Sequence, residues 1–283
     1  MAKAVSSYPF KPSGGETPAE PHDPELPNPA ALSTLGSLSL VNRTALYKAS
    51  FERGVEWLLD HSRPDGSIGE DDGTVFYYRV GWSLALAGRI PEAQAHIAWA
   101  AEHGLPGYGV EAGSLSGGPA EDEQTDSYAL TCIAMGASLL HRDDIAAECG
   151  RLITQFQHPE SGGFVNNLGG SDFSQEEVLM STAQGGMSLL QLGRLEDAVR
   201  VGEWHQKLWA AQPDIGSALY HTWSPRADGL RTELREGEEQ SELYCIKDDV
   251  WQWHFDGGIA AAFLGKLCVP PKPTRARRMV PGT

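Results

Sequence analysis

The sequence predicts an all-α fold of helical hairpins, arranged as a double ring of inner and outer helices. One observation behind this prediction is a repeat, because four apolar segments of similar pattern end at a basic residue, namely Arg89, Arg142, Arg194 and Lys266. The intervals between these residues are 53, 52 and 72 positions, and such a period is typical of stacked supersecondary units. A second observation is that few segments favour strands, since the β-branched runs are short.

The repeat occupies the middle of a chain that we divide into three parts. Residues 1–40 are rich in Pro, Gly, Ser and Glu and have little apolar periodicity, which predicts an extended or mobile arm. Residues 41–270 carry the helical pattern and predict a single domain. Residues 271–283 contain the basic run KPTRARR and predict a flexible tail.

The first predicted helix begins near Thr44, a residue suited to an N-cap, and ends at the sequence RPDG of residues 63–66. Its apolar residues share one face, as expected for an amphipathic helix: Leu46, Phe51, Val55, Leu58 and Leu59.

The remaining helices alternate between two kinds. Helices rich in small residues end at the four basic positions, over residues 81–89, 134–142, 183–194 and 256–266. Amphipathic partners with acidic first turns follow three of them, over 91–104, 143–157 and 195–212. Small residues let backbones crowd together, so the first kind is expected to form the inner ring rather than an open solenoid.

About 20 extra residues precede the last inner helix, in the region 222–242. This stretch is polar, charged and too long for an ordinary connection. Two interpretations stay open at this point, a lid over a site and a disordered insertion.

Composition limits the possible partners. The formal net charge is −16, which opposes binding to nucleic acid and to anionic membranes. No apolar run reaches the roughly 20 residues of a membrane span, and the first residues lack a secretory pattern. We therefore expect a soluble, cytoplasmic protein whose partner is a small molecule. The four cysteines lack zinc-site spacing and are expected to be free, mostly buried thiols.

Four segments carry a family resemblance: WLLDHSRPDGSIG (57–69), FYYRVGWSLALAGRIPEAQAHIAWA (76–100), ITQFQHPESGGFVNN (153–167) and KLWAAQPDIGSALY (207–220). Over residues 44–268 the chain resembles the α/α-toroid superfamily, typified by terpenoid cyclases and protein prenyltransferases. The resemblance implies an α/α toroid whose pocket lies at the ring mouth, where loops lead into the inner helices.

The chain departs from that family in its catalytic motifs. The acid motif DxDD and the diphosphate-binding motif DDxxD are absent, and Cys245, Asp249 and His254 match the prenyltransferase zinc set only loosely. We therefore expect no metal and no cofactor, and diphosphate ionisation is unsupported.

Acidic residues precede the inner helices at matching positions. Asp72, Glu177 and Asp249 lie 17 residues before their basic register residues, and Asp126 lies one residue further into its own helix. Acids at helix starts often complement the helix dipole, worth about 0.3–1 kcal/mol each. Facing carboxylates in a dry funnel would instead repel, which raises some pKa values and provides an acid beside a base. Asp126 is the strongest catalytic candidate, because capping explains it least.

Histidines and aromatic residues complete the predicted site. His254 lies near two acids and is the candidate partner of Asp126 in acid/base catalysis, with Asp249 and Asp72 as further catalytic candidates. Glu177 and His221 are candidate substrate contacts, and the expected lining is aromatic: Tyr77, Tyr78, Trp82, Tyr128, Trp251 and Trp253. Such stripes also occur in ordinary cores.

These observations lead to a functional hypothesis with two alternatives. The leading hypothesis is an isomerase or lyase, a cyclase-like enzyme that acts on an apolar, terpenoid- or polyketide-like molecule by carboxylate and His catalysis. A carbohydrate-active enzyme, such as a glycoside hydrolase, epimerase or lyase, is one alternative. A non-catalytic helical-repeat binding protein is the other.

Overall fold

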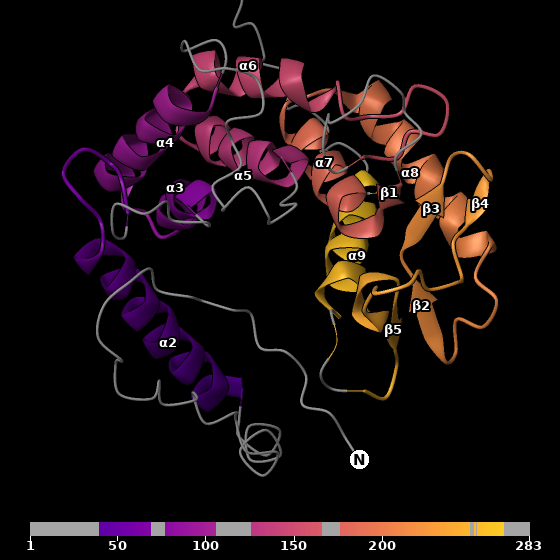
Figure 1. Cartoon of the computed structure of the whole chain (residues 1–283). Coiled ribbons are helices and arrows are strands. Elements are labelled where there is room, and N and C mark those ends of the chain that lie inside the picture. The colour runs from indigo at the N-terminus through magenta and orange to yellow at the C-terminus, as the bar shows by residue number, and fades with distance from the viewer. Residues whose placement is uncertain are drawn as a thin grey trace, which may run out of the picture. The chain divides into compact units, whose positions relative to one another are not determined.

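The computed structural model describes residues 40–68, 77–105, 126–165, 176–249, 252 and 254–268, and the chain divides into two units after Gly54 (Figure 1). The first unit is described from Leu40 to Gly54, which is the first part of helix α2 (Leu40–Asp60). The predicted helix start at Thr44 is wrong, because the helix already includes Leu40 and the Thr44 hydroxyl donates to the Leu40 carbonyl. A Thr hydroxyl that bonds four residues back lies inside a helix rather than at its cap.

The second unit is mostly helical, as the sequence predicts. Three helical hairpins follow one another: α3 (Tyr77–Leu86) with α4 (Ile90–Gly104), α5 (Asp126–Leu139) with α6 (Asp143–Ile153), and α7 (Leu179–Gln191) with α8 (Leu195–Ala210). Helix α9 (Phe255–Leu267) packs on α7. Helices α3, α5, α7 and α9 contact one another in that order, and α4, α6 and α8 form a second layer (Figure 1). Among the described residues α9 makes no extensive contact with α3, so these contacts alone do not close a ring.

Each hairpin turns through the same backbone geometry. The residue before the register arginine has a positive φ, which is 75° at Gly88, 55° at His141 and 73° at Gly193. The next amide reaches back five residues, so that Arg89 donates to Leu84, Arg142 to Ala137 and Arg194 to Leu189, at 2.8–2.9 Å. This is the Schellman pattern of helix ends. Lys266 differs, because α9 continues past it to Leu267.

Small residues lie where helices approach closely. A Cβ atom on Gly136 of α5 would be 3.1 Å from the main-chain nitrogen of Trp82 in α3 and 2.7 Å from Ile97 Cδ1 in α4. A Cβ atom on Gly186 of α7 would be 2.5 Å from the ring of Phe263 in α9. Glycine therefore permits the spacing of the inner layer, as the small-residue pattern predicts.

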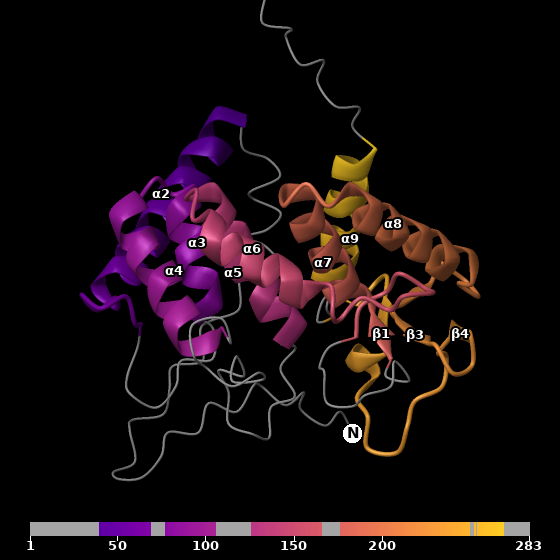
Figure 2. The same cartoon turned by 90° about the horizontal axis from the view of Figure 1, so that it is seen from above.

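Two small antiparallel sheets accompany the third hairpin. Strands β1 (Glu177–Val178), β3 (Thr222–Ser224) and β4 (Gly229–Leu230) form one sheet in that order, and β2 (Ala218–Tyr220) pairs with β5 (Tyr244–Ile246) in the other. Figure 2 shows β1, β3 and β4 next to one another beside α7 and α8. The region 222–242 thus contains β3, β4 and the 3₁₀ helix η2 (Gln240–Glu242), so the disordered-insertion alternative is wrong. No helix within the described ranges has the length and apolar character needed to cross a bilayer.

Candidate functional site

The N-terminal ends of the inner helices lie on the same side of the layer, because these helices run parallel. Between α5 and α7, the Ser188 hydroxyl donates to the Thr131 carbonyl, and one turn further along both helices the Gln191 side-chain amide donates to the Met135 carbonyl. The residue numbers increase together along the two helices, as they do in a parallel pair. Four of the predicted site residues lie at these ends: Tyr77 and Asp126 are the first described residues of α3 and α5, Glu177 lies two residues before α7, and His254 is the N-cap of α9. Asp72, Trp251, Trp253 and the side chains of Tyr77 and Asp126 lie outside the described residues.

Tyr78 and Tyr128 come together between α3 and α5. Their rings meet edge to face with centroids 6.0 Å apart, and the Arg79 guanidinium lies 5.0 Å from the Tyr128 centroid and 5.6 Å from that of Tyr78. Both rings are buried, and burial raises the pKa of Tyr128 to about 12. Trp82 is half-buried and packs against the core. Two of the predicted lining aromatics therefore form one cluster, covered by a cation that the sequence reasoning missed.

Glu177 is completely enclosed, with 0% of its surface exposed. Its carboxylate accepts hydrogen bonds from the Ser161 hydroxyl and the Trp204 indole N–H. Burial raises its pKa, and the two hydrogen bonds act in the opposite direction. A Cβ atom on Gly163 would be 2.3 Å from Glu177 Oε2, so this glycine makes room for the carboxylate. The described contacts of Glu177 tie the loop before β1 to α8.

Asp249 and His254 come together just before α9. The His254 Nε2 atom lies 2.5 Å from the main-chain oxygen of Asp249, whereas the Asp249 carboxylate accepts from Gln252 Nε2 at 3.0 Å. His254 is exposed. The predicted acid and His are therefore neighbours, but the described contact of the ring is to the peptide carbonyl.

His221 is buried, with 1% of its surface exposed, between β2 and β3. Its Nε2 lies 3.1 Å from the Ser241 carbonyl, its Nδ1 has no hydrogen-bond partner among the described residues, and burial lowers its pKa to about 4. The imidazole is therefore neutral near pH 7 and donates through Nε2. Its own carbonyl accepts from the Leu179 amide at 2.8 Å, which ties this segment to the start of α7.

Asp256 is a buried carboxyl two residues after His254, and it is not among the predicted catalytic residues. It lies in the first turn of α9, is 1% exposed, and its Oδ1 has no hydrogen-bond partner among the described residues. Burial raises its pKa to about 7. Capping does not explain this residue, since it lies two positions after the N-cap His254 and no hydrogen bond within the described part of the chain offsets the effect of burial on its pKa. Its spacing from Ala260 and Phe263 could have revealed it, because these three positions share the buried face of the helix.

Asp256 therefore differs chemically from the other carboxylates at this end. Glu177 is held by two donors, and Asp249 by Gln252. A carboxyl that is dry, lacks a hydrogen-bond partner for one oxygen and is half-protonated near neutral pH can give or accept a proton. No group of three His, Cys, Asp or Glu side chains within the described ranges is placed to hold a metal ion.

No protein-family model matches the chain, and no curated protein or solved structure is significantly similar to it. The resemblance to α/α toroids therefore stays an expectation from the sequence.

Proposed function

We propose that this chain is an isomerase or lyase, a cyclase-like enzyme, that acts on an apolar, terpenoid- or polyketide-like molecule by carboxylate acid/base catalysis. The observation that supports the proposal is the buried Asp256 carboxyl, 1% exposed and with no hydrogen-bond partner for Oδ1 among the described residues. Perturbed carboxyls of this kind are concentrated at catalytic sites.

The pKa of about 7 suits Asp256 to proton transfer near neutral pH. The carboxylic acid protonates a substrate carbon or oxygen, and the carboxylate accepts a proton from a neighbouring carbon. Isomerisation and elimination proceed by proton transfers of this kind, and neither needs a net oxidant or reductant. Asp126 and His254, at the starts of α5 and α9, remain the proposed partners.

We further propose that the hairpins belong to an α/α toroid whose site lies at the N-terminal ends of the inner helices. Parallel inner helices backed by a second layer support this arrangement. A sugar-binding site at the same place is less well supported, because the rings of Tyr78 and Tyr128 are buried and offer no open face. Glu177 favours the remaining alternative, a non-catalytic repeat protein, because its carboxylate already accepts two hydrogen bonds from within the protein.

Exchange of substrate hydrogen with solvent deuterium tests the proposal. The full chain is incubated in D₂O with a panel of apolar polyenes, lactones and ketones, and mass spectrometry detects deuterium uptake or new isomers. We expect at least one compound to be converted by the native chain and its conversion to fall by about 10² or more in Asp256→Asn. Conversion that persists in a folded Asp256→Asn variant removes Asp256 from the mechanism, and no conversion across the panel contradicts the enzyme class.

A further inference from the structure

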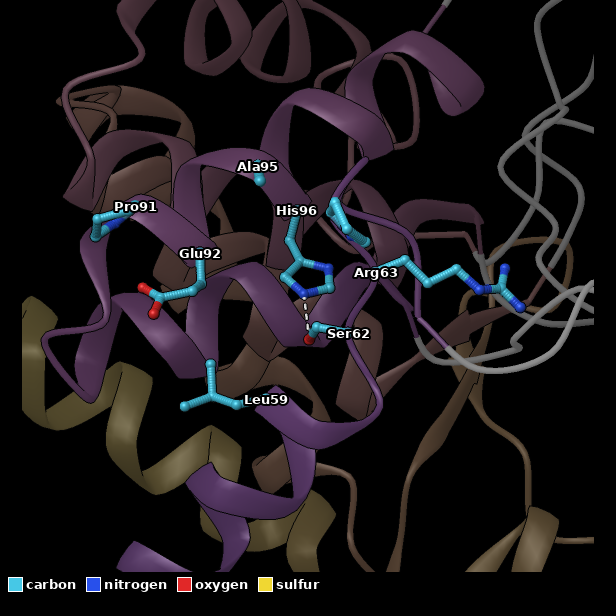
Figure 3. Close-up of a pocket in the computed structure, with 8 residues that line it drawn as sticks. Leu59, Ser62, Arg63, Pro91, Glu92, Ala95 and His96 are labelled. Carbon is cyan, nitrogen blue, oxygen red and sulfur yellow. Dashed lines mark hydrogen bonds between the residues drawn. The ribbon is translucent and has the colours of Figure 1, made fainter.

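A separate pocket opens in the second unit between the end of α2 and helix α4 (Figure 3). Its volume is about 510 Å³, which lies within the range of small-molecule sites. Apolar walls come from Leu59, Pro64, Pro91 and Ala95, and the polar pair Ser62 and His96 faces the same space. None of these residues belongs to the inner-helix ends, so the pocket is independent of the function proposed above.

Ser62 and His96 are in direct hydrogen-bond contact. The Ser62 Oγ lies 2.8 Å from His96 Nε2, and Figure 3 shows the imidazole pointing at the hydroxyl. His96 is only 3% exposed, and the nearby main chain of Gly66 favours its protonated form.

The contact with Ser62 suits a neutral imidazole that acts as a base. In the tautomer with the hydrogen on Nδ1, Nε2 accepts from the Ser62 hydroxyl. Burial lowers the pKa of His96, so the ring is neutral at pH 7. The Ser62 hydroxyl donates its single hydrogen to the Leu58 carbonyl at 2.6 Å, and rotation about the Cβ–Oγ bond turns the same hydrogen toward His96 Nε2. A base within hydrogen-bond distance of a serine hydroxyl is the arrangement that activates a nucleophile.

Two other repeats within the described residues show that the fold does not need this chemistry. Ser62 and Gln157 each open a loop closed by an isolated β-bridge, to Ile68 and Phe164 respectively. Both loops contain a glycine of positive φ, Gly66 and Gly162, that touches the outer helix of the following hairpin. In the second case the Gln157 amide spans the gap, with Nε2 donating to the Asp197 carbonyl at 2.9 Å.

After the third outer helix, α8, a glutamine side chain again bonds to the main chain of the following segment. Gln212, which follows α8, donates to the Tyr220 carbonyl and accepts from the Tyr220 amide, both at 2.9 Å. Two positions of the repeat are thus filled by an inert amide, whereas the first has a hydroxyl and an imidazole beside a pocket.

We propose that Ser62 is an acyl-accepting nucleophile with His96 as its general base, in a site for small esters with a short apolar acyl group. The Ser62 oxygen attacks the ester carbonyl carbon, and its proton moves to His96 Nε2. The carbon–oxygen bond to the alcohol breaks, and the leaving alkoxide takes the proton from Nε2. Water then attacks the acyl-serine, His96 accepts its proton and returns it to Ser62, and a carboxylic acid leaves.

The pocket walls define the acyl group that fits. Leu59, Pro64, Pro91 and Ala95 present carbon surface on which an acetyl to butyryl chain loses contact with water. Glu92 also lines the pocket, yet it has no part in the proposed proton path. A Glu92→Gln variant is therefore a matched control that keeps the pocket and its shape.

Covalent labelling of the full chain tests this inference. The protein is incubated with phenylmethylsulfonyl fluoride and with p-nitrophenyl butyrate, and peptide mass mapping locates the adducts. We expect a single sulfonyl adduct at Ser62 and a burst of p-nitrophenolate. Labelling disappears in Ser62→Ala, falls by about 10² or more in His96→Asn and is unchanged in Glu92→Gln. Circular dichroism and thermal melting verify that each variant is folded.

Two outcomes overturn the inference. One is the absence of any adduct at Ser62 of the native chain under excess reagent, a result that needs no variant. The other is a His96→Asn variant that is folded and labels at the native rate, since Ser62 is then not activated by the imidazole.

Discussion

The carboxylate of Glu177 accepts the indole N–H of Trp204 in a place where neither side chain reaches solvent. Glu177 comes from β1 and Trp204 from α8, and Ser161 supplies the second donor from the loop before β1. A buried carboxylate is costly unless donors surround it, so these two bonds hold three segments in one arrangement.

We predict that Trp204→Phe lowers the free energy of unfolding by about 2–4 kcal/mol, because the carboxylate loses a donor and the core loses volume. Urea denaturation followed by circular dichroism measures the loss. The matched control is Trp209→Phe on the same helix, whose side chain is 62% exposed and whose replacement should change stability by less than about 0.5 kcal/mol. Equal effects at both positions would contradict the role given to the buried pair.

Asp256 gives a prediction about pH. Its folded pKa is raised to about 7 from an ordinary value of 3.8, so the folded chain binds a proton that the unfolded chain releases. The stability from this carboxyl is present below pH 4 and is lost as pH rises to about 7. Asn keeps the shape without ionising, so Asp256→Asn should stabilise the chain at pH 8 by up to about 4 kcal/mol and leave it nearly unchanged at pH 4.

Thermal melting at the two pH values measures this difference. Asp248→Asn is the control, because Asp248 is exposed, and its effect should be small at both pH values. A melting difference for Asp256→Asn that is the same at pH 4 and pH 8 contradicts the raised pKa.

Substitutions to or from glycine should change stability with opposite signs, according to whether the backbone at that position has a positive φ. Gly193 has a φ of 73° with open space around its Cβ position, so Gly193→Ala should cost about 1–2 kcal/mol through backbone strain alone. His141 occupies the matching position with a φ of 55°, and His141→Gly should therefore be neutral or stabilising. Gly258 also has open space but lies inside α9, where Gly258→Ala should stabilise by about 0.5–1 kcal/mol. Chemical denaturation of the three variants checks the order of stability.

The hairpins could be predicted from the sequence because their signals are local and periodic. Arg89, Arg142 and Arg194 each follow a turn whose geometry needs a positive φ, and the repeated spacing exposed that need without any tertiary information. Lys266 fits the same spacing, yet α9 runs past it, because a similar apolar pattern does not specify where a helix ends.

The small sheets could not be predicted in this way. Strands such as β1 and β4 contain two residues each, which is too short for a period of two to be visible. Their partners are also distant, since Glu177 pairs with Trp223. For the candidate site, the register of acids indicated residues just before α7 and α9, namely Glu177 and Asp249. It could not reveal that the Glu177 carboxylate has two donors whereas Asp256 Oδ1 has no hydrogen-bond partner among the described residues, because such contacts depend on tertiary packing.

An ion-pair cluster explains why the region 222–242 is held in place. The Arg231 guanidinium pairs with Glu176 at 3.0 Å through Nε and with Glu238 through both terminal nitrogens, and these side chains are 12–19% exposed. Arg235 also pairs with Glu176. The loop after β4 is therefore tied to the residue before β1, next to the start of α7.

We predict that Arg231→Met releases this loop. Two carboxylates then lose a half-buried cation, so amide hydrogen exchange in 229–238 should speed up by about tenfold or more, with the inner helices little changed. The hydrogen bond from Arg231 lowers the pKa of Glu238, so its stabilising contribution is present above the ordinary pKa and is lost as pH falls through the folded value. Acidification below about pH 4 should therefore have the same effect on the native chain. Lys247→Met, a change at an exposed cation outside the cluster, should leave exchange in 229–238 unaltered, and a comparable acceleration there would show that the ion pairs do not hold the loop.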